Sequence, residues 1–189
     1  MEKLREISGR GLRAYNFVVQ QLKSSKKLDW KDRKLVHKAN VILNSEIHKF
    51  VINDLKGMHA KSVLEIGCGD GSLLKELSRE KSFANSGLFG IDKSPKAIAR
   101  ARRASKMARP VHFGVGRNNR IPYADKFDLI STVLSFHEWK NGNRSIPYIL
   151  SKLNKKGLFL IYDTLPVRIK GRRLLQRNSM LVKATFIAK

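Results

Sequence analysis

Residues 63–77 read VLEIGCGDGSLLKEL, an apolar run with one glutamate that leads into three closely spaced glycines. The pattern predicts a strand that ends near Ile66, a tight turn, and a helix that begins near Ser72. Glycines at 67, 69 and 71 can adopt positive φ and let a ligand approach the backbone closely. The first turn of the helix adds unpaired N–H groups, which favour a carboxylate or a phosphate. The stretch therefore predicts a ligand-binding turn.

The spacing of the glycines narrows the ligand. A dinucleotide fingerprint would place a third glycine at position 72, which is serine, and no P-loop lysine follows. Glu65, just before the turn, disfavours a pyrophosphate and suits an ammonium or a sulfonium. Asp92 ends the next apolar run, 25 residues after Gly67, where an acid can accept hydrogen bonds from ribose hydroxyls. S-adenosylmethionine carries all these groups; the alternative is a plain strand–helix turn with surface acids.

The rest of the chain repeats this alternation of strands and helices. Short apolar runs at 62–66, 87–91, 111–115, 127–134 and 158–163 are separated by helical patterns at 72–80, 94–107 and 143–153. Near-continuous apolar strands between helices indicate a parallel sheet covered on both faces, and so a doubly wound α/β fold. The last run, 180–189, favours a strand and is expected to form an antiparallel edge of that sheet.

The N-terminal part of the chain has a different rhythm. Residues 1–58 are predicted to be helical, with one helix over about 11–26 and a second from an Asp29 cap to about Leu55, before Gly57. This segment either caps the ligand cleft or only covers the sheet. Residues 59–189 are expected to form the core, with a shortened C-terminal end, because only 26 residues follow Asp163.

Four stretches carry a resemblance to a known family: VLEIGCGDGSL (63–73), GIDKS (90–94), IPYADKFDLISTVLSFHEW (121–139) and LNKKGLFLIYD (153–163). They resemble the successive motifs of class I S-adenosylmethionine-dependent methyltransferases, which have a mostly parallel Rossmann-like sheet. The resemblance implies that Asp92 binds the ribose, that Lys93 borders the adenine, and that Thr132, just past the fourth strand, lies beside the methionine moiety. It implies a methionine end formed by Glu65, Gly67, Cys68, Gly69 and Gly71.

One motif departs from the family. Where methyltransferases often have Gly-Asp-Ala, with an acid that contacts the adenine amine, this chain has Gly116-Arg117-Asn118. Arginine cannot accept a hydrogen bond, so Asn118 or a backbone carbonyl is expected to take that role. Arg117 either contacts an anionic substrate or is a solvated loop charge.

The candidates for chemistry lie in SFHEW, residues 135–139. His137 could act as a general base, Glu138 could orient it or bind an amine, and Trp139 could stack on a ring. The alternative is that His137 and Trp139 pack against the next helix. The chain lacks the Pro-Pro motif that enzymes methylating base amines carry after the fourth strand. Its five histidines are scattered, so no metal site is expected.

Charge is the unusual feature of the composition. The chain has 39 Lys and Arg against 15 Asp and Glu, a net charge of +24. This favours an anionic partner such as RNA, or else reflects a generally basic surface. One cysteine excludes an internal disulfide, and no apolar run approaches a membrane span, so we expect a soluble, cytoplasmic protein without membrane contact.

Together these features predict a methyltransferase that uses S-adenosylmethionine, releases S-adenosylhomocysteine and acts on RNA or another polyanion. The alternatives are a small-molecule methyltransferase and a non-catalytic RNA-binding protein on the same scaffold. A nicotinamide-dependent oxidoreductase is disfavoured by Ser72. The sequence leaves the oligomeric state open.

Overall fold

A computed structural model describes residues 30–103, 108–164 and 181–188, which divide into two compact units. The described part of the first unit is residues 30–54, and that of the second is residues 55–103, 108–164 and 181–188. Most of the first unit lies outside the described residues, including the predicted helix over 11–26. Helix α2, Trp30–Leu55, confirms the second predicted helix.

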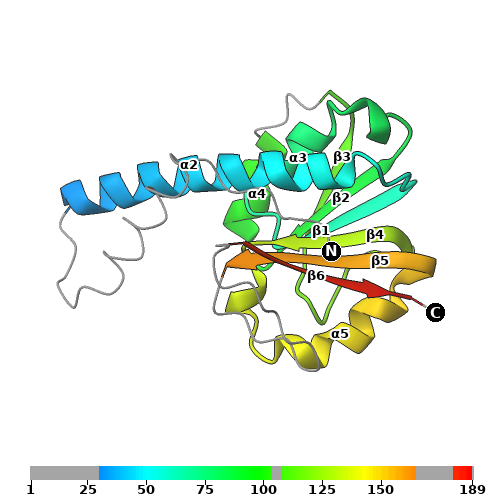
Figure 1. Cartoon of the computed structure of the whole chain (residues 1–189). Coiled ribbons are helices and arrows are strands. Elements are labelled where there is room, and N and C mark those ends of the chain that lie inside the picture. The colour runs from blue at the N-terminus through cyan, green and yellow to red at the C-terminus, as the bar shows by residue number, and fades with distance from the viewer. Residues whose placement is uncertain (1–29, 104–107, 165–180, 189) are drawn as a thin grey trace. The chain divides into compact units, whose positions relative to one another are not determined.

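The second unit contains a six-stranded sheet in the order β3-β2-β1-β4-β5-β6 (Figure 1). Its strands are β1 (Ser62–Ile66), β2 (Gly87–Asp92), β3 (Val111–Val115), β4 (Phe127–Val133), β5 (Leu153–Thr164) and β6 (Leu181–Ile187). The first five pair in parallel, and β6 pairs antiparallel with β5. The predicted doubly wound sheet with an antiparallel edge strand is confirmed.

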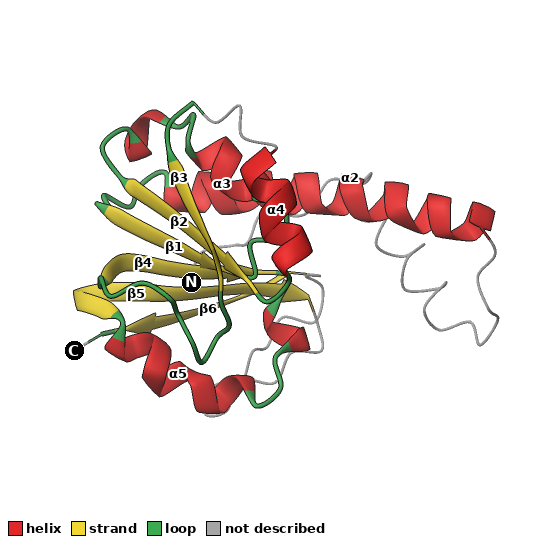
Figure 2. Ribbon diagram, turned by 180° about the vertical axis from the view of Figure 1, so that it is seen from behind, coloured by secondary structure: helices red, strands yellow, loops and turns green. Residues whose placement is uncertain are grey.

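Helices cover both faces of this sheet, as the two ribbon views show (Figures 1 and 2). Helices α3 (Ser72–Leu77) and α4 (Pro95–Arg103) lie on one face, and α5 (Gly142–Ser151) lies on the other. Two short 3₁₀ helices, η1 (Lys81–Phe83) and η2 (Phe136–Glu138), complete the described elements. On the α5 side, Ile146 and Ile149 pack with Leu64, Ile66 and Ile130 of the central strands.

The order of the strands places the ligand site. Strand β1 pairs with β2 on one side and with β4 on the other. The chain therefore winds away from β1 in both directions, and a crevice opens beyond the carboxyl ends of β1, β2 and β4, which is where open α/β sheets bind ligands. The glycine turn after β1 lies at this crevice.

Some element boundaries differ from the prediction. Helix α3 ends at Leu77, and β5 begins at Leu153, five residues before the predicted start at Leu158. The sequence does not predict the early part of β5 because Asn-Lys-Lys-Gly has no alternation of apolar and polar residues. It pairs through an irregularity, since Phe127 pairs with Leu153 and Leu129 with Leu158, and Lys156 takes a positive φ of 64°.

Within the described residues, no helix is both long and apolar enough to cross a membrane.

Candidate active site

The turn after β1 has the backbone that its glycines predict. Gly67, Gly69 and Gly71 have φ values of +82°, +56° and +77°. The backbone N–H groups of Gly67 and Cys68 donate to the carbonyl of Ile91 at 2.8 and 3.0 Å. The turn is therefore tied to the end of β2.

The three glycines are required for different reasons. A Cβ on Gly67 would lie 2.2 Å from the Ser135 Oγ atom, and a Cβ on Gly71 would lie 2.6 Å from the ring of Phe113. A Cβ on Gly69 would meet nothing within 4 Å. Packing therefore demands glycine at 67 and 71, whereas only the positive φ favours it at 69.

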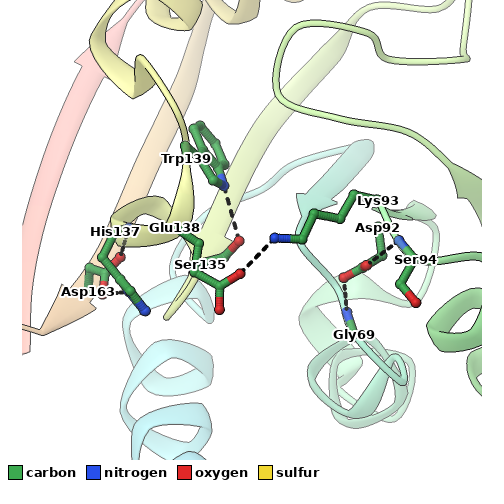
Figure 3. A network of polar contacts seen from close by, with 9 residues as sticks. All are labelled: Gly69, Asp92, Lys93, Ser94, Ser135, His137, Glu138, Trp139 and Asp163. Carbon is green, nitrogen blue, oxygen red and sulfur yellow. Dashed lines mark hydrogen bonds and ion pairs between the residues drawn. The ribbon is translucent and has the colours of Figure 1, made fainter.

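Asp92, at the end of β2, braces the turn (Figure 3). Its Oδ2 accepts a hydrogen bond from the Gly69 N–H at 3.0 Å, and its Oδ1 accepts one from the Ser94 N–H at 2.8 Å. The carboxylate is half-buried and lines a cavity. Each of its oxygens can accept a second hydrogen bond, so Asp92 can still receive ribose hydroxyls.

The cavity at the carboxyl ends of the strands has a volume of about 320 Å³, within the range of small-ligand pockets. Several predicted site residues reach it: Gly67, Asp92, Lys93, Asn118 and Glu138. It is also lined by residues to which the sequence analysis assigned no ligand contact: Ile66, Gly116, Asn119, Ser135 and Lys140. Arg117 and Trp139 complete the lining.

The expected position of Thr132 was wrong. Strand β4 runs to Val133, so Thr132 lies inside the strand and not past its end, and its side chain is fully buried. Cys68 is buried and does not line the cavity. Its sulfur lies 3.0 Å from the position that a Cβ on Gly90 would take. Burial, with the nearby charges of Glu65 and Asp92, raises the pKa of the thiol.

Glu65 is a buried carboxyl with an unsatisfied oxygen. It is 3% exposed, and among the described residues its Oε2 atom has no hydrogen-bond partner. Burial raises its pKa to about 8, with further contributions from Asp70 and Asp92. Its register neighbour on β4, Ser131, also has a buried hydroxyl without a partner. Glu65 does not line the cavity, but an ammonium or a sulfonium would fit the unpaired oxygen of its carboxyl.

After β4 the chain turns sharply beside the cavity. Leu134 has a positive φ of 50°, and its N–H donates to the Tyr162 carbonyl at 2.8 Å. The turn directs Ser135 toward Gly67, and the Trp139 indole N–H donates to the Ser135 Oγ at 3.1 Å. Trp139 also packs on buried Phe136, with ring centroids 4.9 Å apart. Trp139 therefore packs on its own segment and also lines the cavity.

His137 is held by Asp163, the last residue of the apolar run of β5 (Figure 3). The Asp163 Oδ2 accepts the His137 backbone N–H at 2.9 Å, and the Oδ1 lies 2.8 Å from the His137 Nδ1. The Asp163 side chain is 1% exposed, whereas the imidazole is 46% exposed. The sequence assigned no role to Asp163, although an acid at the carboxyl end of a strand was a usable signal.

Glu138 does not orient His137, which was one of its two predicted roles. Its carboxylate instead pairs with the Lys93 ammonium at 2.9 Å, from the opposite side of the cavity (Figure 3). Both side chains are more than half exposed, so the ion pair contributes little stability. Its position makes it a contact between the end of β2 and η2.

Asn118 is oriented by a neighbouring element. Its Nδ2 donates to the Ser145 hydroxyl of α5 at 2.6 Å. With one amide N–H used in this way, the Oδ1 atom remains available as an acceptor in the cavity that Asn118 lines. This is the acceptor that the prediction required for the adenine amine. Arg117 is exposed and lines the same cavity.

Comparison with known proteins agrees with this geometry. The profile of a family described as a methyltransferase domain matches residues 58–182, well over half of the chain. This chain belongs to that methyltransferase family. The match confirms the predicted class I S-adenosylmethionine-dependent methyltransferase, with S-adenosylmethionine as the methyl donor. The nicotinamide-dependent oxidoreductase has no support here.

Individual relatives are more distant. The present chain is 24% identical over 149 residues to a probable cobalt-precorrin-6B C(15)-methyltransferase (decarboxylating) of Methanococcus vannielii, with 77% of each chain covered. A crystal structure of the plantazolicin methyltransferase BamL with a desmethylPZN analog and SAH has a TM-score of 0.57 at 23% identity, covering 84% of this chain and 60% of that chain.

The cyclase SpnF has a TM-score of 0.51 at 23% identity, covering 66% of this chain and 49% of that chain. The present chain thus spans only about half to three fifths of the lengths of the BamL and SpnF chains. At such identities the two structures show the shared fold alone.

Within the described residues, no group of three metal-ligating side chains comes together.

Proposed function

We propose that this chain transfers the methyl group of S-adenosylmethionine to a nucleophile that must lose a proton, carried by RNA or another polyanion. The observation that carries the proposal is the His137–Asp163 pair, with Nδ1 and Oδ1 2.8 Å apart. His137 does not itself line the cavity, but it lies on the short segment whose Ser135, Glu138 and Trp139 do. A buried carboxylate that holds an exposed imidazole is the arrangement expected of a positioned general base.

The residues present fit the methyl donor. The orphaned Glu65 carboxyl suits its cationic methionine end, and Asp92 has free lone pairs for the ribose. The Asn118 Oδ1 atom can accept from the adenine amine, because Ser145 engages the Nδ2 atom. Because Gly67 has no side chain, Ser135 can approach the turn closely, and both residues line the cavity.

The pair favours one tautomer of the neutral imidazole. The Asp163 carboxylate accepts from Nδ1–H, which leaves the Nε2 lone pair free to take a proton. S-adenosylmethionine supplies the methyl group and a neutral thioether leaving group, so no acid is needed. As the nucleophile forms its bond to the methyl carbon, its proton passes to the His137 Nε2 atom, and the carboxylate of Asp163 stabilises the resulting imidazolium.

The acceptor class rests on charge. A net charge of +24 favours a polyanion, and RNA is the most natural one. A small-molecule acceptor is the second candidate, since the curated relative is named as a cobalt-precorrin methyltransferase. A third is a non-catalytic RNA-binding protein, which the arginine at position 117 favours. Residues 1–58 are proposed to cap the cleft, and the single cysteine suits a cytoplasmic protein.

The proposal is tested with tritiated S-adenosylmethionine. The purified protein is incubated separately with total RNA and with the small-molecule fraction of a cell extract, beside a His137→Gln variant. We expect label in RNA with the wild-type protein and at least a hundredfold less with the variant, since a general base contributes about a hundredfold or more. Equal label transfer by both proteins would contradict the base.

Label only in the small-molecule fraction would select the second candidate. S-adenosylmethionine binding and RNA binding without transfer to either fraction would select the non-catalytic one. A thermal-shift titration with S-adenosylmethionine, S-adenosylhomocysteine and NAD checks the donor independently. A ligand at a hundredfold excess over its Kd stabilises the folded state by about 2.7 kcal/mol, and only the first two are expected to do so.

A further inference from the structure

Four exposed basic residues lie on two segments beside the cavity. Arg117 and Arg120 belong to the loop after β3, Lys140 lies two residues before α5, and Arg144 lies in its first turn. We call these four residues the basic rim. Residues 116–123 and 139–151 contain no aspartate or glutamate, so each segment contributes positive charge alone.

The two segments of the basic rim are fastened to each other. Arg117 and Arg120 exchange backbone hydrogen bonds of 3.0 and 2.9 Å, which close the loop into a tight turn. This turn is tied to α5 twice, through the Asn118–Ser145 hydrogen bond of 2.6 Å and a 2.9 Å bond from the Ile121 N–H to the Tyr148 hydroxyl. The four cations therefore share one structural support.

Two acids, Asp92 and Glu138, line the cavity beside the basic rim, and each already has a partner. Both oxygens of Asp92 accept backbone N–H groups, and Glu138 pairs with Lys93. Across residues 30–103, 108–164 and 181–188, no ion pair involves a member of the basic rim. Arg117 and Lys140 line the cavity itself, so the excess positive charge extends from the rim into the site.

We propose that the basic rim binds phosphate groups of an RNA acceptor strand and holds the target nucleotide at the cavity. The inference rests on the proposed function, because it places the acceptor of that reaction. Arginine suits the task, since its planar fork matches the geometry of phosphate oxygens. The amino end of α5, which begins at Gly142 between Lys140 and Arg144, adds partial positive charge.

The test compares two double variants that remove equal charge. Arg120→Gln with Arg144→Gln removes two rim cations that do not line the cavity. Lys126→Gln with Lys155→Gln removes two exposed lysines near the amino ends of β4 and β5, at the other end of the sheet. The full-length protein, with S-adenosylhomocysteine present, is titrated against a short fluorescein-labelled oligouridylate, by fluorescence anisotropy at several salt concentrations.

We expect the rim variant to lose two phosphate contacts. The slope of log K against log salt then becomes shallower by about 1.4, at about 0.7 for each single-strand contact, and affinity at 0.1 M salt falls by roughly 25-fold. The matched control keeps the wild-type slope. Both variants keep the wild-type affinity for S-adenosylhomocysteine, which shows that they are folded.

Three results would overturn the inference. Equal losses in the two variants would mean that binding follows net charge and not the rim, and absence of oligouridylate binding by the wild type would remove the RNA strand altogether. Displacement of the probe by uridine monophosphate at the same concentration would point to a small phosphorylated acceptor instead. Since this assay needs no turnover, rim-dependent binding with no methyl transfer to RNA would refute the proposed function separately.

Discussion

Gly67 offers a sharp test of how the turn after β1 builds the site, because Gly69 is a matched control. Both residues have a positive φ, so an alanine at either position carries a left-handed strain of about 1–2 kcal/mol. Only at Gly67 would the new Cβ collide with another residue, 2.2 Å from the Ser135 Oγ atom, whereas at Gly69 it would meet open space.

The difference between the two variants can be worked out from contacts. Gly67→Ala must displace Ser135, and with it the 3.1 Å hydrogen bond from the Trp139 indole, at an added cost of about 1 kcal/mol. Gly67→Ala is therefore expected to lower the free energy of unfolding by about 2–3 kcal/mol, and Gly69→Ala by about 1–2 kcal/mol. Since Gly67 and Ser135 both line the cavity, Gly67→Ala should also weaken S-adenosylhomocysteine binding at least tenfold, about 1.4 kcal/mol.

Urea unfolding and isothermal titration with S-adenosylhomocysteine measure the two effects. The double variant Gly67→Ala with Ser135→Gly removes the collision, so the costs of the two single changes should not add. Equal destabilisation by Gly67→Ala and Gly69→Ala would refute the reasoning. So would strict additivity in the double variant, because it would show that the collision does not determine the cost.

Further predictions concern three carboxyl groups. Between pH 4.5 and about 8 the folded state keeps the Glu65 proton that the unfolded chain has lost, so the free energy of unfolding falls as pH rises. Glu65→Gln should flatten this pH dependence in urea unfolding, and an unchanged pH dependence would contradict a raised pKa of Glu65. Asp163→Asn should lower methyl transfer about a hundredfold while S-adenosylhomocysteine affinity stays within about twofold, and unimpaired transfer would remove the pair from the chemistry. Partial burial acts to raise the pKa of Asp128, but hydrogen bonds from the Asn154 side chain and the Lys61 and Ser62 N–H groups lower it below its ordinary value. Asp128→Ala should therefore lower the free energy of unfolding by about 1–3 kcal/mol at pH 7, and by less as pH falls through the folded pKa. An equal loss in acid would contradict a stabilising role of these hydrogen bonds.

Much of the fold and part of the site could be predicted from the sequence because the signals are local. Each signal spans only a few consecutive residues: the glycines after β1, the apolar runs of the parallel strands and the acid at the end of β2. Five of the predicted site residues line the cavity: Gly67, Asp92, Lys93, Asn118 and Glu138. The family match to residues 58–182 agrees with the motifs that carried the resemblance.

Other features could not be predicted because a boundary or an orientation depended on packing. Thr132 was placed past the end of a strand that in fact continues to Val133, so it is buried. Cys68 lies in the turn, but its side chain fills space beside Gly90 and not the cavity. The polar residues at the start of β5 show no strand pattern in the sequence. They belong to the sheet only through an irregular pairing with β4.

The sequence by itself determined the sheet, the turn and the kind of ligand, since each follows from residues adjacent in the chain or repeated at the period of a strand or helix. Only the tertiary structure decided which side chains act together. His137 meets Asp163 across 26 residues because the register of β4 and β5 pairs Val133, four residues before His137, with Tyr162, the residue before Asp163. The basic rim forms because α5 folds back against the loop after β3. Such contacts depend on strand order and helix packing, which no local pattern encodes.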